Sequence, residues 1–125
     1  MKNQRYDNLK ARTKRFVLDV VMLVDSLCEG HSARVLGMQL LRAGSSVGAN
    51  YRAACRAKSR ADFISKMGTV EEEADESAFW IEVLVDSGKV ARLAAEPLLQ
   101  EANELTAIAV ASILTARGPS VPPKR

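Results

Sequence analysis

The chain has 125 residues, of which 47% are hydrophobic and 5% aromatic, and it carries a formal net charge of +3. This length predicts one domain with a core of its own, the apolar content excludes disorder along the whole chain, and the modest charge does not by itself indicate nucleic acid. No apolar run reaches the ~18 residues of a membrane span, no segment resembles a signal peptide, and Cys28 and Cys55 form no CxxC motif, so we expect a cytoplasmic protein without membrane contact.

The N-terminal part predicts a flexible arm over residues 1–9 and a broadly apolar helix over about 10–28. Two adjacent seams at helical spacing run along this helix, one of Phe16, Val20, Leu23 and Leu27 and the other of Val17, Val21, Val24 and Cys28. Together they form a stripe that is wider than one bundle core needs. The helix is therefore either central and covered on all sides, or its outer seam is buried against another subunit, which is the interpretation that we favour.

The second helix is expected over about 33–57, after a stop at Gly30 and with Ser32 as its N-cap. It contains Gly44 and Gly48, each of which costs about 1 kcal/mol relative to Ala in a helix interior. A helix that tolerates both glycines predicts a close approach of its backbone to a neighbouring helix.

The third helix is expected over about 60–87, because Ser59 and Asp62 resemble a capping box and Gly88 suits the residue after the C-cap. The fourth helix is expected over about 95–117, with Pro97 in its first turn.

A flexible tail over 118–125 completes the chain, which shows no strand alternation. The pattern predicts an all-α fold, an antiparallel up-down-up-down four-helix bundle over residues 10–117.

Acidic side chains crowd the third helix between Glu71 and Glu76, where like charges four residues apart repel one another. Helical wheels bring the second helix's polar residues toward them, so we expect a buried structural network of Arg42, Asn50, Glu73 and Glu76. We expect Gly44, Gly48 and Trp80 to serve helix packing. The alternative for the network is contact with a ligand or a partner.

His31 is the single histidine, whereas a di-iron bundle site needs a Glu-x-x-His pair on each of two helices. Ser45, Ser46 and Ser59 have no histidine positioned to activate them. We therefore expect no metal, no cofactor and no catalytic residue, and hence no enzyme.

Between the second and third helices lies a basic turn composed of Arg52, Arg56, Lys58, Arg60 and Lys66. Cations this close together favour contact with phosphates of RNA or DNA without reading sequence, and Tyr51 could stack on a base. A solvated face and a protein-binding surface are the alternatives. The basic N-terminal segment could be a second nucleic-acid contact or a solubilising tail.

Three motifs support a family resemblance: Leu40–Ala53 (LLRAGSSVGANYRA), the AKSRADF run from Ala57 to Phe63, and the acidic stretch that ends in Phe79-Trp80. With these motifs the chain resembles, over about residues 8–117, the four-helix-bundle proteins encoded by intervening sequences inside bacterial 23S ribosomal RNA genes. The chain departs from the family pattern at Ala53, Arg56 and Glu72, where members often have Glu, Gly and a basic residue.

The resemblance implies an antiparallel four-helix bundle that assembles as a ring-shaped homopentamer. It also implies kinship with an accessory protein of diversity-generating retroelements, which binds nucleic acid and a reverse transcriptase. We therefore expect a homo-oligomeric accessory factor that binds nucleic acid. The alternative is a structural adaptor whose ring binds a protein partner such as a reverse transcriptase.

Overall fold

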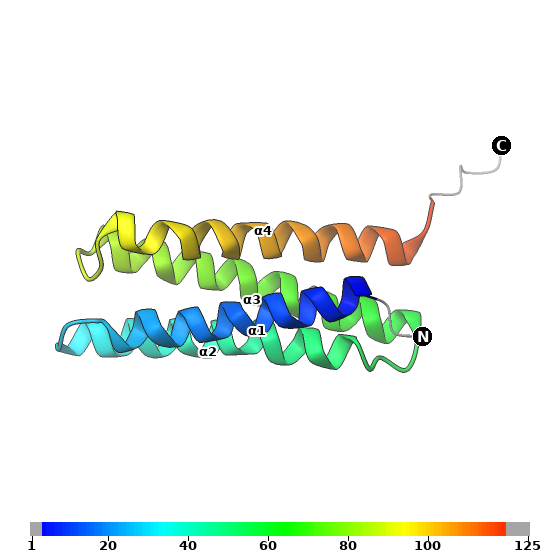
Figure 1. Ribbon diagram of the computed structural model, residues 1–125, viewed down its shortest axis with the longest axis horizontal. Helices are drawn as coiled ribbons and strands as arrows, with labels where there is room; N and C mark the ends of the chain where they lie inside the picture. Colours follow the sequence, from blue (N-terminus) through cyan, green and yellow to red (C-terminus); the bar gives the residue numbers. More distant parts are fainter. Residues whose placement is uncertain (1–3, 120–125) are drawn as a thin grey trace.

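The computed structural model describes residues 4–119, which form four helices connected by short turns: α1 (Gln4–Asp25), α2 (His31–Ala54), α3 (Arg60–Asp86) and α4 (Arg92–Arg117). Successive helices run in alternating directions (Figure 1), so that α1 and α3 share one direction and α2 and α4 the other. No strand occurs between residues 4 and 119. The predicted all-α, up-down-up-down four-helix bundle is therefore confirmed.

The helices pack unequally around one core. α3 lies along both α2 and α4, α1 packs on α2, and the contact between α1 and α4 is much smaller. Each fully buried large side chain contributes about 1.5–3 kcal/mol to folding. The largest apolar ones are Phe16, Val20, Leu40, Val47, Tyr51, Met67, Ile81 and Leu84. Alanines fill much of α4's inner face, with Ala95, Ala102 and Ala109 fully buried, so the helix axes can lie close together.

α1 differs from its predicted bounds at both ends, since it begins at Gln4 and ends at Asp25. Residues 4–9, predicted as part of a flexible arm, are therefore helical, while residues 1–3 lie outside the described residues. Gln, Arg and Leu in this segment are good helix formers, and the segment continues without a break into the helix that follows, so the helix can start early.

α2 begins at His31 rather than at residue 33, and the predicted N-cap Ser32 is wrong. Gly30 occupies the N-cap with φ of 152°, a backbone conformation that side chains with a Cβ rarely adopt, and no side chain caps the helix. The helix ends at Ala54, three residues earlier than predicted, because the chain must turn before it reaches the cap of α3.

The predicted ends of α3 are confirmed at the level of their hydrogen bonds. Ser59 Oγ accepts from the backbone N–H of Asp62 at 3.0 Å, while the Asp62 carboxylate accepts from the N–H of Lys58 at 3.0 Å. At the other end, Lys89 N donates to Leu84 O at 2.8 Å, and the N–H of Gly88 donates to Val85 O. These two hydrogen bonds, together with the φ of 77° at Gly88, form a Schellman motif.

α4 begins at Arg92, three residues before the predicted start, and ends at Arg117, followed by the C-cap Gly118, whose φ is 77°. Pro97 therefore lies beyond the first turn, where its missing N–H leaves the carbonyl of Leu93 without its helical donor. Leu93 is 84% exposed, so water can satisfy that carbonyl and the helix tolerates the proline.

Candidate functional site

The seam between α1 and α2 depends on two glycines. A Cβ added to Gly44 would lie 2.9 Å from both Val20 methyl carbons, and one added to Gly48 would lie 2.7 Å from Val17 Cγ2. Real Cβ atoms do not approach other atoms this closely, so α1 can lie against α2 only because both positions lack a side chain. This contact fixes the position of α1, and with it the charged residues of its first turns.

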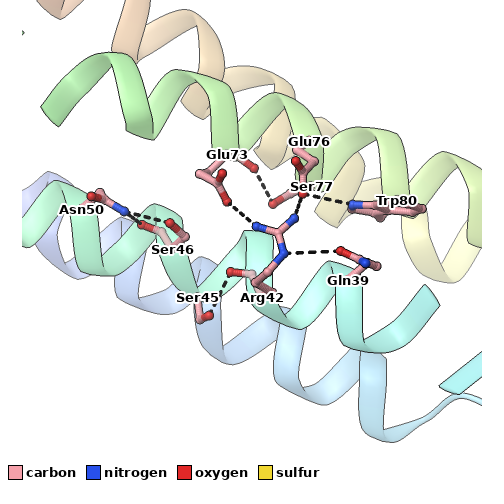
Figure 2. Close-up of polar contacts among 9 residues, drawn as sticks. All are labelled: Gln39, Arg42, Ser45, Ser46, Asn50, Glu73, Glu76, Ser77 and Trp80. Carbon is pink, nitrogen blue, oxygen red and sulfur yellow. Dashed lines mark hydrogen bonds and ion pairs between the residues drawn. The ribbon is translucent and has the colours of Figure 1, made fainter. Parts of the chain in front are cut away.

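Arg42 on α2 is the centre of a polar network with α3 (Figure 2). Its guanidinium pairs with Glu73 at 3.2 Å and with Glu76, and its Nε donates to Gln39 Oε1 at 3.3 Å. Trp80 Nε1 donates a hydrogen bond to the Glu76 carboxylate at 3.2 Å, so Trp80 belongs to the network. The Trp80 ring also packs edge to face against the Phe79 ring, with 4.9 Å between the two ring centroids. The structure thus brings together Arg42, Glu73, Glu76 and Trp80.

Asn50 does not belong to this network, contrary to the sequence-based expectation. Its amide donates to the backbone carbonyl of Ser46 at 2.9 Å and to Ser46 Oγ at 2.7 Å, within its own helix (Figure 2). A helical wheel places Asn50 on the correct side, but the nearer acceptors of the preceding turn bind it first.

The network is also less buried than expected. The Arg42 side chain is 52% exposed and Glu76 is 36% exposed, whereas Glu73 is 17% exposed. Ion pairs at this depth are partly screened by water, so the network sets the register of α2 against α3 more than it adds stability.

The basic turn lies at the end of the bundle where α1 begins and α4 ends (Figure 1). Arg52, Arg56, Lys58 and Arg60 are all exposed, and none of them forms an ion pair with the residues that the structure describes. Such cations retain their full capacity to contact an anionic partner.

Lys66, the fifth cation of the predicted set, is paired. Its Nζ lies 2.5 Å from Asp62 Oδ1, one helical turn back along α3. The hydrogen bond from Lys66, together with that from the N–H of Lys58, lowers the pKa of Asp62 below its ordinary value. Lys66 therefore contributes to the start of α3 and less to the free positive charge of the turn.

Tyr51 cannot stack on a base as the sequence suggested. Its side chain is 1% exposed and lies within the core, which fixes the last turn of α2 from inside. At this end of the bundle the cations are therefore exposed, but the Tyr51 ring is not available for stacking on a base.

A cleft of about 550 Å³ extends the positive surface along the seam of α1 and α2. Lys10 and Lys14 of α1 and Arg52 of α2 stand around it, and Gly48 and Ala49 form part of its small-residue floor. Sequence reasoning gave the basic N-terminal segment no fixed position. The helical start of α1 brings its lysines beside Arg52.

The ion pair that joins α1 to α4 was not predicted from the sequence. Arg12 donates from Nε and Nη2 to the two carboxylate oxygens of Glu101, each at 2.7 Å, and Glu104 lies 3.6 Å from Nη2. The hydrogen bonds to Glu101 raise the pKa of Arg12 above its ordinary value. An acid and a base ~90 positions apart give no local signal that could have identified this pair.

The described residues contain no group of three or more His, Cys, Asp or Glu side chains that could hold a metal ion. Within residues 4–119, no helix has both the length and the apolarity that crossing a bilayer requires.

The chain is similar to one known protein family and to a solved structure. The family described as 23S rRNA-intervening sequence protein matches residues 8–111, a range that includes both the polar network and the basic turn. A crystal structure of a protein of unknown function, from the S23 ribosomal protein family and from Bacteroides thetaiotaomicron VPI-5482, is 33% identical to the chain. The similarity covers 83% of this chain and 96% of that one, with a TM-score of 0.78. No curated protein matches the chain.

Proposed function

We propose that this chain, which belongs to the 23S rRNA-intervening sequence protein family, is a non-enzymatic, oligomeric accessory protein that binds structured RNA or DNA through its basic turn. The observation that carries the proposal is the exposure of four cations, Arg52, Arg56, Lys58 and Arg60, whose side chains form no ion pair within the part of the chain that the structure describes. A surface of this kind contacts phosphates and tolerates any sequence.

The distribution of charge over the bundle supports the same proposal. The turn and the neighbouring cleft gather cations at one end, whereas the outward stripe of α3 is acidic from Glu72 to Asp86. A polyanion approaching the molecule would be attracted to the basic end and repelled from the acidic stripe. The charge therefore favours one orientation of a nucleic acid on the protein.

Association of several copies belongs to the proposal, and the resemblance implies five. Large apolar side chains remain exposed on a single chain, among them Met22 (65%), Met38 (65%) and Leu114 (60%). Copies that cover such residues would also combine their basic turns into one surface, which raises avidity without new contacts. Free Cys28 and Cys55 support a cytoplasmic location for this assembly.

Salt-dependent binding to a structured RNA tests the proposal. Arg56→Ala/Arg60→Ala removes two cations of the turn, and Lys89→Ala/Arg92→Ala removes two cations from the opposite end as a matched control. Each phosphate contact contributes ~0.9 to the slope of log K against log salt, so we expect the first variant to flatten that slope by about 2 and to weaken binding at least tenfold at low salt.

The control should bind like the wild type. Equal binding by the wild type and Arg56→Ala/Arg60→Ala, or no binding by the wild type at low salt, would overturn the proposal. Fluorescence anisotropy with a labelled hairpin measures both affinity and slope, and circular dichroism checks that each variant is folded.

A structural adaptor that binds a protein is the second candidate, and the exposed Phe79 on α3, beside the partly buried Trp80, favours it. Phe79 is 52% exposed against Trp80, and aromatic residues are enriched where proteins meet. Retention of a protein partner after nuclease treatment and in high salt, with no affinity for RNA, would support this function instead.

A further inference from the structure

The outer face of α1 and α2 carries a groove that the proposed nucleic-acid contact does not use along most of its length. The cleft beside Lys14 and Val17 opens at one end of the seam, and a second cleft of about 540 Å³ opens beside Val24 and Met38 at the other. Val21 and Leu41, which are 36% and 37% exposed, lie between the clefts. The two clefts are therefore separated by a stretch of the seam whose exposed surface is apolar.

The groove has a positive end. Lys10 and Lys14 border its first cleft, are exposed and form no ion pair with any described residue. Lys14 precedes Val21 by seven residues, two helical turns, so charge and apolar surface lie on the same side of α1 about 10.5 Å apart.

An outward stripe of α3 has the complementary pattern. Glu72 and Asp75 are exposed and unpaired among the described residues, and Phe79 follows Glu72 by seven residues on the same side of the helix. Phe79 is 52% exposed, so its ring can contact a partner. The spacing from acid to aromatic on α3 thus equals the spacing from base to valine on α1.

We propose that the α1–α2 groove of one copy receives the α3 stripe of a second copy, with Phe79 against Val21 and Glu72 against Lys14, while Lys10 and Asp75 add opposite charges on either side of that pair. The proposal rests on the oligomeric part of the proposed function and names the surfaces that join the copies. It accounts for two features that one chain leaves unexplained, namely an exposed aromatic residue and a row of acids without cations.

The direction of the helices allows this contact to repeat from one copy to the next. α1 and α3 run in the same direction within one chain (Figure 1), and the matched spacings align them in parallel between copies. Neighbouring copies then point the same way, as they do around a rotation axis parallel to the helices. Because groove and stripe are different surfaces, the contact is head to tail and repeats around a ring. Every basic turn would face the same side of that ring.

Charge reversal in two variants tests the contact. Lys10→Glu/Lys14→Glu makes the groove acidic, and Glu72→Lys/Asp75→Lys makes the stripe basic. Each variant alone then opposes like charges, so we expect light scattering to give single chains of 13.6 kDa. An equimolar mixture restores opposite charges wherever unlike variants meet, which in a ring of five is possible at all contacts but one, and should recover an assembly that contains both variants.

A matched control, Lys89→Glu/Arg92→Glu, reverses two cations outside the groove and should assemble like the wild type. Wild-type protein that is a single chain at all concentrations, reversal variants that assemble like the wild type, or a mixture of folded variants that stays unassembled would each overturn the proposal. All masses are measured after nuclease treatment. An assembly without RNA affinity would therefore refute nucleic-acid binding and leave this interface standing.

Discussion

Arg12 of α1 and Glu101 of α4 form a two-point ion pair, with both N–O distances at 2.7 Å, where the two helices otherwise touch little. α1 is held to the rest of the bundle mainly by the glycine seam with α2. The pair closes the bundle on its fourth side, and its planar geometry makes it stronger than an ordinary surface pair.

Replacing Arg12 by alanine should loosen α1 from α4. We expect a loss of about 1 kcal/mol in the free energy of unfolding, since the Arg12 side chain is 37% exposed and water screens the pair. Urea denaturation at low and high salt measures the loss, which should shrink as salt screens the charges.

Arg15→Ala is the matched control for this change. Arg15 pairs with Asp19 on its own helix at 3.1 Å and is 70% exposed, so its removal should change stability little. Equal effects of the two substitutions would mean that the α1–α4 pair does not hold the helices together.

Helix number, order and most of the terminal signals could be predicted from the sequence because they depend on neighbours in the chain. Ser59 caps its own helix through Asp62, and α3 ends where Gly88 donates to Val85 O and Lys89 donates to Leu84 O. The start of α2 was misplaced because Gly30 and Ser32 both suit an N-cap, and backbone geometry favoured the glycine.

The candidate site was only partly predictable, since it depends on distances between helices. Arg42 and Glu73 were expected to meet, but a wheel cannot show that Asn50 would satisfy its amide on Ser46 instead. Arg12 and Glu101 belong to the first and last helices, so their pairing requires the closed bundle and its register.

Gly44→Ala should destabilise the bundle despite the higher helix propensity of alanine. Its Cβ would meet both methyl carbons of the fully buried Val20 at 2.9 Å, and α1 would have to move outward. We expect a loss of about 1–3 kcal/mol from overpacking, measured by thermal and urea unfolding. Gly48→Leu, with a larger side chain against Val17, should cost more.

Gly68→Ala on α3 should have the opposite effect and stabilise the protein. A Cβ there meets nothing within 4 Å, so the substitution should raise stability by up to about 1 kcal/mol through helix propensity alone. A Gly44→Ala protein that gains as much as Gly68→Ala would show that α1 does not lie against α2 as described.

The start of α3 should respond to acid through Asp62. The folded-state pKa of this carboxyl is lowered, first by the hydrogen bond from Lys66 and then by the N–H of Lys58, so its contribution to stability is present above the ordinary Asp pKa and lost as pH falls through the lowered value. Melting temperatures of the wild type and Asp62→Asn should differ at neutral pH and converge toward pH 2. A constant difference over this range would contradict the assignment.

Arg42→Ala should uncouple α2 from α3 and leave Glu73 and Glu76 as unscreened like charges one turn apart. We expect a loss of about 1 kcal/mol, and a double-mutant cycle with Glu73→Gln should give a coupling energy of about 0.5–1 kcal/mol. Trp80 is the single tryptophan and donates to Glu76, so its fluorescence spectrum reports on the same network.

Arg34→Ala, an exposed change on the same helix, should alter neither stability nor spectrum. Additive effects of Arg42→Ala and Glu73→Gln, with unchanged Trp80 emission, would show that the pair does not fix the register of the two helices.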